Sequence, residues 1–95
     1  MDITITARHF KAPPELRTFA EKEVRKLRRY FNGVLTCHVV LSREGNRDVA
    51  EIIAHSKKHQ FTVIEASQKM DRAVVQATEK LKTQIKRYKD KITDK

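Results

Sequence analysis

Several features that define other classes of protein are missing from this sequence. A single cysteine, Cys37, allows no internal disulfide and no cluster of thiolate ligands. No run approaches the roughly 20 apolar residues that cross a bilayer, and the N-terminal residues, which include Asp2, alternate apolar with polar, unlike a signal peptide. The chain has only two glycines, two prolines and no low-complexity tract. We therefore expect a folded cytoplasmic protein without membrane contact.

The sequence also lacks the motifs of catalysis and of cofactor binding. It has no Cys-x-x-Cys pair and no Gly-rich phosphate loop. His55 and His59 are four residues apart, but they lie in a segment predicted as a strand running into a turn, which does not favour a zinc pair. Cys37 and His38 point to opposite sides of a predicted strand, so no base approaches the thiol. We predict that the protein is not an enzyme and holds no metal and no cofactor.

Positive charge is what the sequence has in excess, and it is concentrated in two segments. The net charge is +9 over 95 residues, a length typical of one small domain, here residues 1–95. Residues 15–31 hold six bases and three acids, and residues 67–92 hold eight bases and three acids, whereas residues 32–64 hold four bases and three acids. Segregated positive charge is typical of proteins that bind polyanions.

The first basic segment has the period of an amphipathic helix. Its apolar residues recur at steps of three and four between Leu16 and Phe31, and its bases lie opposite or beside that stripe. Pro13 and Pro14 suit the first turn, where a missing N–H group leaves no helix bond unmade. The Asn-Gly pair at 32–33 is typical of a helix end. We predict one continuous helix over this segment.

The second basic segment is also predicted to be an amphipathic helix. Ser67 is the expected N-cap, and one apolar stripe runs from Met70 to Ile92. Bases on the polar side of a helix often only solvate it. In the first helix, however, they stand three and four residues apart with few acids nearby, so they repel one another. This repulsion favours an anionic partner.

Four shorter segments alternate apolar and polar residues and predict strands at residues 3–6, 35–42, 49–55 and 61–66. Turn residues join the last three strands at 44–47 and 56–59. These short connections favour antiparallel pairs, whereas the helical connection after the first strand allows it to pair parallel with the second. The order is β-α-β-β-β-α. We therefore predict an α+β fold, a four-stranded mixed sheet with two helices packed on one face.

Two basic helices on one face of a sheet favour nucleic acid as the partner. The aromatic residues fall mostly at core-facing positions, which argues against a platform for stacking single strands. Basic helices at a fixed separation suit the phosphate rows of folded RNA. Two alternatives stay open, namely a general double-stranded-RNA-binding module and a protein that binds and modulates an acidic transcription factor.

Five runs of residues carry a closer resemblance, in order along nearly the whole chain. They are residues 3–9, LRTFAEKEVRKLRRYF at 16–31, HVVLS at 38–42, VAEI at 49–52 and EKLKTQIKRYKDKI at 79–92. These runs resemble the ribosome hibernation promoting factor and ribosome-associated inhibitor family. The chain departs from the family where the second helix starts, because Lys69-Met70-Asp71 replaces Asp-Met-Tyr and Val75 replaces an Asp.

The resemblance implies a ribosome hibernation factor whose partner is rRNA of the small ribosomal subunit. Family members occupy the channel of the messenger RNA and the tRNA anticodon ends, which inhibits translation. The chain looks like the short form, in which ribosome dimers depend on a separate small factor, so we expect a monomer when it is free. Family positions give as rRNA contacts Lys22, Lys26, Lys80, Gln84 and Lys89, and helical geometry adds Arg25, Arg29, Lys86 and Arg87.

Overall fold

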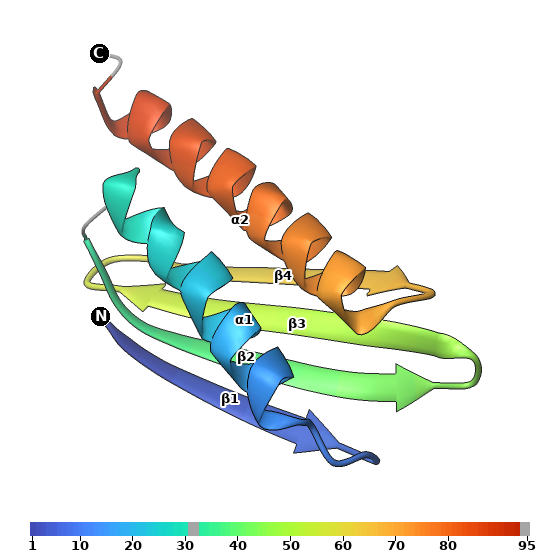
Figure 1. Ribbon diagram of the computed structural model, residues 1–95. Coiled ribbons are helices and arrows are strands. Elements are labelled where there is room, and N and C mark those ends of the chain that lie inside the picture. Colours follow the sequence, from blue (N-terminus) through green and yellow to red (C-terminus); the bar gives the residue numbers. More distant parts are fainter. Residues whose placement is uncertain (31–32, 94–95) are drawn as a thin grey trace.

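In the part of the chain that the structure describes, four strands form one sheet, and two helices cover one of its faces (Figure 1). The computed structural model describes residues 1–30 and 33–93. The strands lie in the spatial order β1 (Asp2–Arg8), β2 (Val34–Glu44), β3 (Arg47–Ser56) and β4 (Gln60–Ser67). β1 pairs parallel with β2, and the other neighbours are antiparallel. The predicted fold, including its mixed sheet and its element order, is confirmed.

The first helix is shorter than predicted because its last turn is tighter. α1 spans Pro14–Arg25 and is followed by a 3₁₀ helix, η1, at Lys26–Arg29. The N–H of Tyr30 donates to the carbonyl of Leu27 at 3.0 Å, a bond that closes η1. Bonds between residues three apart satisfy carbonyls that would otherwise lack partners at a helix end. Pro14 lies in the first turn as predicted, whereas Pro13 precedes the helix as its N-cap residue. The predicted end at Asn32 lies outside the described residues.

The second helix, α2 (Met70–Thr93), begins three residues later than its predicted cap. Ser67 is not an N-cap; it is the last residue of β4 and pairs with Asp48 of β3. The hydrogen bonds of the sheet hold the chain extended up to that point. The carbonyl of Lys69 accepts the first helical bond, from the N–H of Ala73 at 3.0 Å.

One apolar core lies between the sheet and the helices. Alternate residues of the strands point into it, among them Cys37, Leu41 and Ile52, while Leu27 and Leu81 enter from the helices. Cys37 is 1% exposed, and its burial raises the pKa of the thiol to about 11. Cys37 is therefore a core residue, and His38 lies on the opposite side of β2, as predicted.

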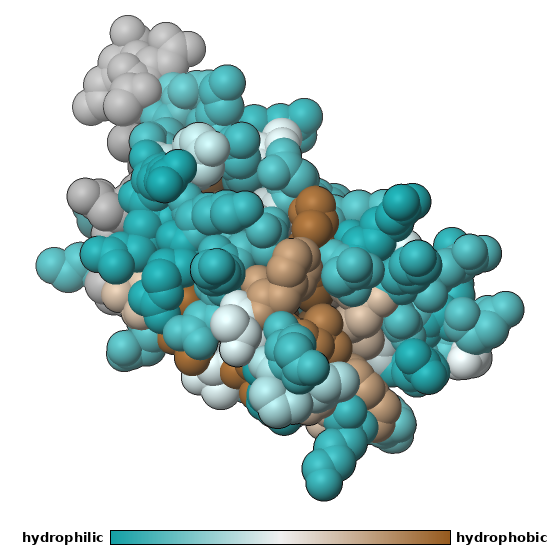
Figure 2. Space-filling model, viewed as in Figure 1, coloured by the Kyte–Doolittle hydropathy of each residue, from teal (hydrophilic) through white to brown (hydrophobic). Residues whose placement is uncertain are grey.

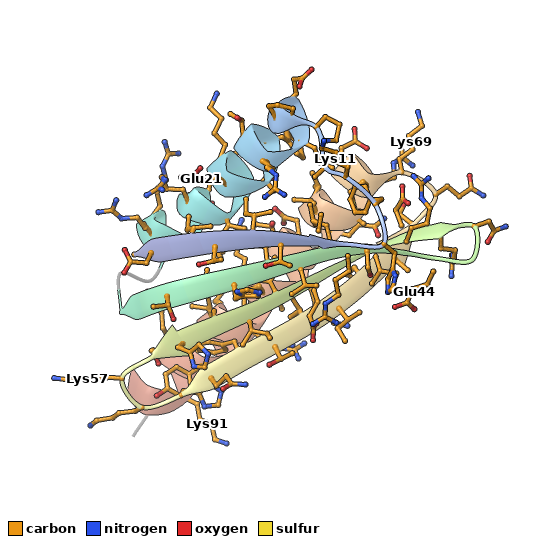
Figure 3. All side chains as sticks on the ribbon, turned by 90° about the horizontal axis from the view of Figure 1, so that it is seen from below. Lys11, Glu21, Glu44, Lys57, Lys69 and Lys91 are labelled. Atoms are coloured by element: carbon orange, nitrogen blue, oxygen red, sulfur yellow. The ribbon has the colours of Figure 1, made fainter. Side chains whose placement is uncertain are left out.

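Among the described residues, no helix lies on the opposite face of the sheet, as the view from below shows (Figure 3). On this face the side chains of Thr6 and His38 lie within hydrogen-bonding distance at 3.3 Å, and Ile64 is more than half exposed. The β2–β3 turn, beside Glu44, lies at one end of the sheet, and the β3–β4 turn, with Lys57, lies at the other end (Figure 3). Within residues 1–30 and 33–93, no helix combines the length and the apolar character needed to cross a membrane.

Candidate nucleic-acid interface

The two helices lie side by side and run in the same general direction, so their exposed sides form one surface (Figure 1). Eight of the nine predicted contact residues are exposed on this layer, and Gln84 is half-buried. The layer carries the two charge-rich segments of the chain. It is therefore the surface on which a polyanion would find the highest density of cations.

Two hollows follow each other along this surface and form what we call the basic groove. One has a volume of about 500 Å³ and is lined by Phe19, Lys22, Glu23, Arg25, Lys26 and Arg29. The other has a volume of about 510 Å³ and is lined by Arg29, Tyr30, Lys82, Lys86, Lys89 and Asp90. Arg29 borders both hollows, so the groove runs from α1 over η1 to the C-terminal half of α2.

The predicted contact residues of α2 lie on two different sides of the helix. Lys86 and Lys89 line the basic groove together with Lys82, and the three share one side of α2 because they are spaced by four and three residues. Lys80 lies on another side, where its Nζ is 3.2 Å from Glu65 Oε2 of β4. Gln84 and Arg87 follow Lys80 by four and seven residues, so they share that outer side.

Lys82 is a groove residue that is absent from the predicted contacts. The signal that could have found it was its spacing of four and seven residues from Lys86 and Lys89. The helical pattern by itself did not show which side of α2 faces η1.

Two bases of the first helix are neutralised within the protein. Arg25 Nη2 is 2.7 Å from Glu21 Oε2, and Lys26 Nζ is 2.7 Å from Glu23 Oε2. The repulsion expected among these bases is therefore smaller than the sequence indicated, although exposed pairs of this kind contribute only about 0–1 kcal/mol. Within the described part of the chain, Lys22, Arg29 and Lys86 form no ion pair.

Tyr30 differs from the predicted pattern of buried aromatic residues. It is 43% exposed and lines the basic groove. The ammonium of Lys82 lies 4.4 Å from the centroid of its ring, and a hydrogen bond to Tyr30 raises the pKa of Lys82. Lys89 Nζ donates to the carbonyl oxygen of Tyr30. One aromatic residue thus contacts two of the groove's cations, and Tyr30 is an exception to the expectation that the aromatic residues lie mostly at core-facing positions.

Apolar side chains reach the surface beside the start of α2. Phe19 and Val75 line a shallow hollow of about 300 Å³ together with Lys69, Asp71 and Arg72. Figure 2 shows hydrophobic residues (brown) at the surface between the helices, within a mostly hydrophilic face. Val75 is 37% exposed. The surface at the start of α2 therefore mixes apolar and charged side chains, whereas the hollow near its end is lined mainly by cations.

Comparisons with known proteins agree with this arrangement. The family model described as "Sigma 54 modulation protein / S30EA ribosomal protein" matches residues 3–93. The chain belongs to this family. Two curated relatives are named ribosome hibernation promoting factor: that of Klebsiella oxytoca is 25% identical over 92 residues and that of Salmonella typhimurium 27%, with 97% of each chain covered in both cases. The resemblance seen in the sequence is confirmed.

Solved structures of similar proteins show the same fold. The N-terminal domain of Thermus thermophilus Protein Y aligns with a TM-score of 0.85 and 31% identity, over 93% of this chain and 99% of that one. A ribosomal subunit interface protein from Coxiella burnetii aligns with a TM-score of 0.88 and 20% identity, over 94% and 98% of the two chains. The arrangement of helices and sheet is therefore that of these two solved structures.

At the β3–β4 turn, a histidine packs against two aromatic rings. The ring of His59 stacks on Tyr88 of α2, with centroids 4.6 Å apart, and also contacts Phe61 at 4.5 Å. His59 is thus an exposed residue that packs against aromatic rings. In the described ranges, no three His, Cys, Asp or Glu side chains are grouped so that they could hold a metal ion. Ser56 braces the turn through hydrogen bonds with the backbone of His59, which leaves Lys57 and Lys58 exposed at its tip.

Proposed function

We propose that this protein binds the small ribosomal subunit through its basic groove and inhibits translation by occupying the decoding channel. The observation that carries the proposal is the groove itself, where cations from α1, η1 and α2 converge on one exposed surface. The names of the two curated relatives, which are ribosome hibernation promoting factors, support it. A ribosomal partner implies action in the cytoplasm.

The principal contacts are proposed to be groove cations that form no ion pair within residues 1–30 and 33–93. Lys22, Arg29 and Lys86 can bind phosphate without first breaking an internal pair. Arg25 and Lys26 must exchange a glutamate for a phosphate, a small cost because such exposed pairs are weak. Phosphate contacts of this kind position a protein on RNA without reading its sequence.

A second row of contacts is proposed on the outer side of α2. Lys80 and Arg87 supply charge there, and Gln84 between them supplies a neutral hydrogen-bonding group. Lys80 is paired with Glu65, so its contribution is smaller than that of an unpaired lysine. An RNA surface that covers both rows would enclose α2 from two sides.

Inhibition follows from competition and needs no chemistry. A rigid basic domain bound in the decoding channel contacts the rRNA phosphates beside which the messenger RNA and the tRNA anticodon ends would lie. The protein and these RNAs therefore exclude each other. Pairing of ribosomes into dimers is not part of this mechanism, and we assign it to a separate factor. The free protein is proposed to be a monomer.

Sedimentation with purified ribosomal subunits tests the proposal. We expect the protein to co-sediment with small subunits and to be displaced by messenger RNA together with tRNA. An excess of plain duplex RNA should compete poorly, which separates this function from that of a general double-stranded-RNA-binding module. Co-sedimentation that messenger RNA and tRNA leave unchanged would contradict occupation of the channel, and failure to bind small subunits would contradict the proposal as a whole.

A further inference from the structure

The hollow between η1 and α2 contains a side chain that phosphate binding does not require. Arg29, Lys82 and Lys86 supply charge, but Tyr30, which is 43% exposed, lines the same hollow. Phosphates are bound by cations and N–H groups, whereas an exposed aromatic ring offers a flat surface that suits the π-face of a base. A single ring among cations is the combination that binds both parts of a nucleotide.

We propose that this hollow takes up one unpaired RNA nucleotide, with its base against the ring of Tyr30 and its phosphate among the surrounding cations. The inference rests on the proposed function and specifies which part of the RNA enters the groove. A volume of about 510 Å³ is in the range of sites for small ligands. Arg29 also borders the neighbouring hollow, so the strand that carries the nucleotide can continue along the basic groove. This continuity favours a nucleotide within a strand over a free mononucleotide.

In the structure, the ammonium of Lys82 lies over the face of the Tyr30 ring. Its ammonium lies 4.4 Å from the ring centroid, and within residues 1–30 and 33–93 it forms no ion pair with a carboxylate. A base stacked on an aromatic ring is held more strongly than an exposed cation on that ring. The base therefore takes the place of the ammonium, and the flexible lysine side chain turns toward the phosphate.

An unpaired base is essential to this site. In a duplex the base is stacked between its neighbours and paired, so its face cannot reach Tyr30 unless it is extruded, which costs free energy. Side chains that only follow phosphates do not distinguish these two states of RNA. The ring of Tyr30 is therefore a specificity-determining group, because it favours RNA with an accessible base.

Intrinsic fluorescence can report directly on this ring. The chain has no tryptophan and two tyrosines, so the Tyr88→Phe variant leaves Tyr30 as the only strong fluorophore and keeps a ring against His59. The probes are an unstructured RNA strand of about a dozen nucleotides, a duplex with the same number of phosphates, and a nucleoside monophosphate. We expect the strand to quench Tyr30 and the duplex to leave its emission nearly unchanged. Equal quenching by the monophosphate at the same concentration would overturn the assignment to an RNA strand.

Substitution of Tyr30 gives the second arm of the test. Tyr30→Ala should weaken binding of the single strand by about 5- to 150-fold, which corresponds to about 1 to 3 kcal/mol, and should change duplex binding less than twofold. The salt dependence should not change, because no charge is removed. Tyr30→Phe keeps the ring and should retain most of the affinity. A folded Tyr30→Ala protein with unchanged affinity for the strand refutes the inference.

Binding to small subunits, measured on the same proteins, separates this inference from the proposed function. If Tyr30 is quenched by the strand but the wild-type protein does not bind small subunits, the proposed function is wrong and the nucleotide site stands. If small subunits are bound but the strand neither quenches Tyr30 nor depends on it, the nucleotide site is wrong and the proposed function stands. Should Tyr30→Ala fail to fold, the quenching of the Tyr88→Phe protein still decides the question.

Discussion

Replacing Arg29 and Lys86 with alanine tests whether RNA binding depends on the basic groove or only on the net charge of the protein. Both residues line the hollow between η1 and α2, both are exposed, and neither forms an ion pair within the described ranges. The matched control replaces Lys80 and Arg87, on the outer side of α2. Each double variant loses one lysine and one arginine, so the net charge falls from +9 to +7 in both.

The expected difference follows from counterion release. Each phosphate contact contributes about 0.7 to 0.9 to the slope of log K against log salt, so loss of two groove contacts should flatten the slope by roughly 1.4 to 1.8. Between 50 and 200 mM salt, the affinity ratio of wild type to groove variant should therefore shrink about tenfold. The control should flatten the slope by less, because Lys80 is already paired with Glu65 at 3.2 Å.

The assay is equilibrium binding to purified small subunits at several salt concentrations and constant magnesium. Both variants should keep the thermal unfolding of the wild type to within a few degrees, since exposed positions on helices tolerate alanine. Equal flattening by the two variants would show that the groove is not preferred over the outer side. An unchanged slope in the groove variant would refute our assignment of phosphate contacts to Arg29 and Lys86.

Three further predictions concern stability and activity. Cys37→Ala should destabilise the fold by about 1 to 2 kcal/mol at neutral pH, as measured by urea unfolding, without loss of small-subunit binding. Because folding raises the pKa of this thiol from 9.0 to about 11, the wild type should lose stability as the pH rises above 9, and its advantage over Cys37→Ala should shrink by about 1.4 kcal/mol per pH unit and disappear before pH 11; a constant advantage would contradict the pKa shift. Arg43→Ala should lower the free energy of unfolding, since Arg43 Nε is 2.8 Å from Asp48 Oδ1 and the substitution removes the charged partner of a carboxylate that is only 6% exposed; a double-mutant cycle with Asp48→Ala that shows no coupling would refute this. The protein should inhibit translation of leadered and leaderless messages alike in a purified system, because the blocked element is the decoding channel, and inhibition restricted to one message class would argue against that.

The sheet and the covered helix faces were predictable because they depend on local pattern. Alternation in the strands places Cys37 and Ile52 in the core, and the three- and four-residue steps of α2 place Leu81 and Ile85 there. If a strand shifted by one residue, its core side chains would point toward water, so the alternating pattern leaves little choice of register. Boundaries were less predictable. The start of α2 depends on how far β4 pairs with β3, up to Ser67, and this depends on tertiary contacts.

The candidate site was predictable in its charge but not in its arrangement. Helical spacing shows that Lys82, Lys86 and Lys89 share one side of α2, and that Lys80 and Arg87 lie elsewhere. Which side faces α1 depends on the order of the helices on the sheet, and no local pattern encodes that order. The exposure of Tyr30 has the same origin, since a ring at the end of η1 is covered or left open according to where α2 passes.

The distribution of charge between the two layers explains how such a small domain can choose one face for RNA. The helices, α1 with η1 and α2, hold 13 bases and six acids, whereas the four strands hold three bases and five acids. The molecule is therefore an electrical dipole, positive on the helix layer and slightly negative on the sheet. A polyanion attracts the first layer and repels the second, so orientation is set during approach, before any specific contact forms. Within the positive layer, glutamates neutralise Arg25, Lys26 and Lys80, which directs the strongest remaining attraction toward Arg29 and Lys86 in the groove. Glu21, Glu23 and Glu65 thus help to direct RNA toward the hollow between η1 and α2 by weakening the attraction at these three cations.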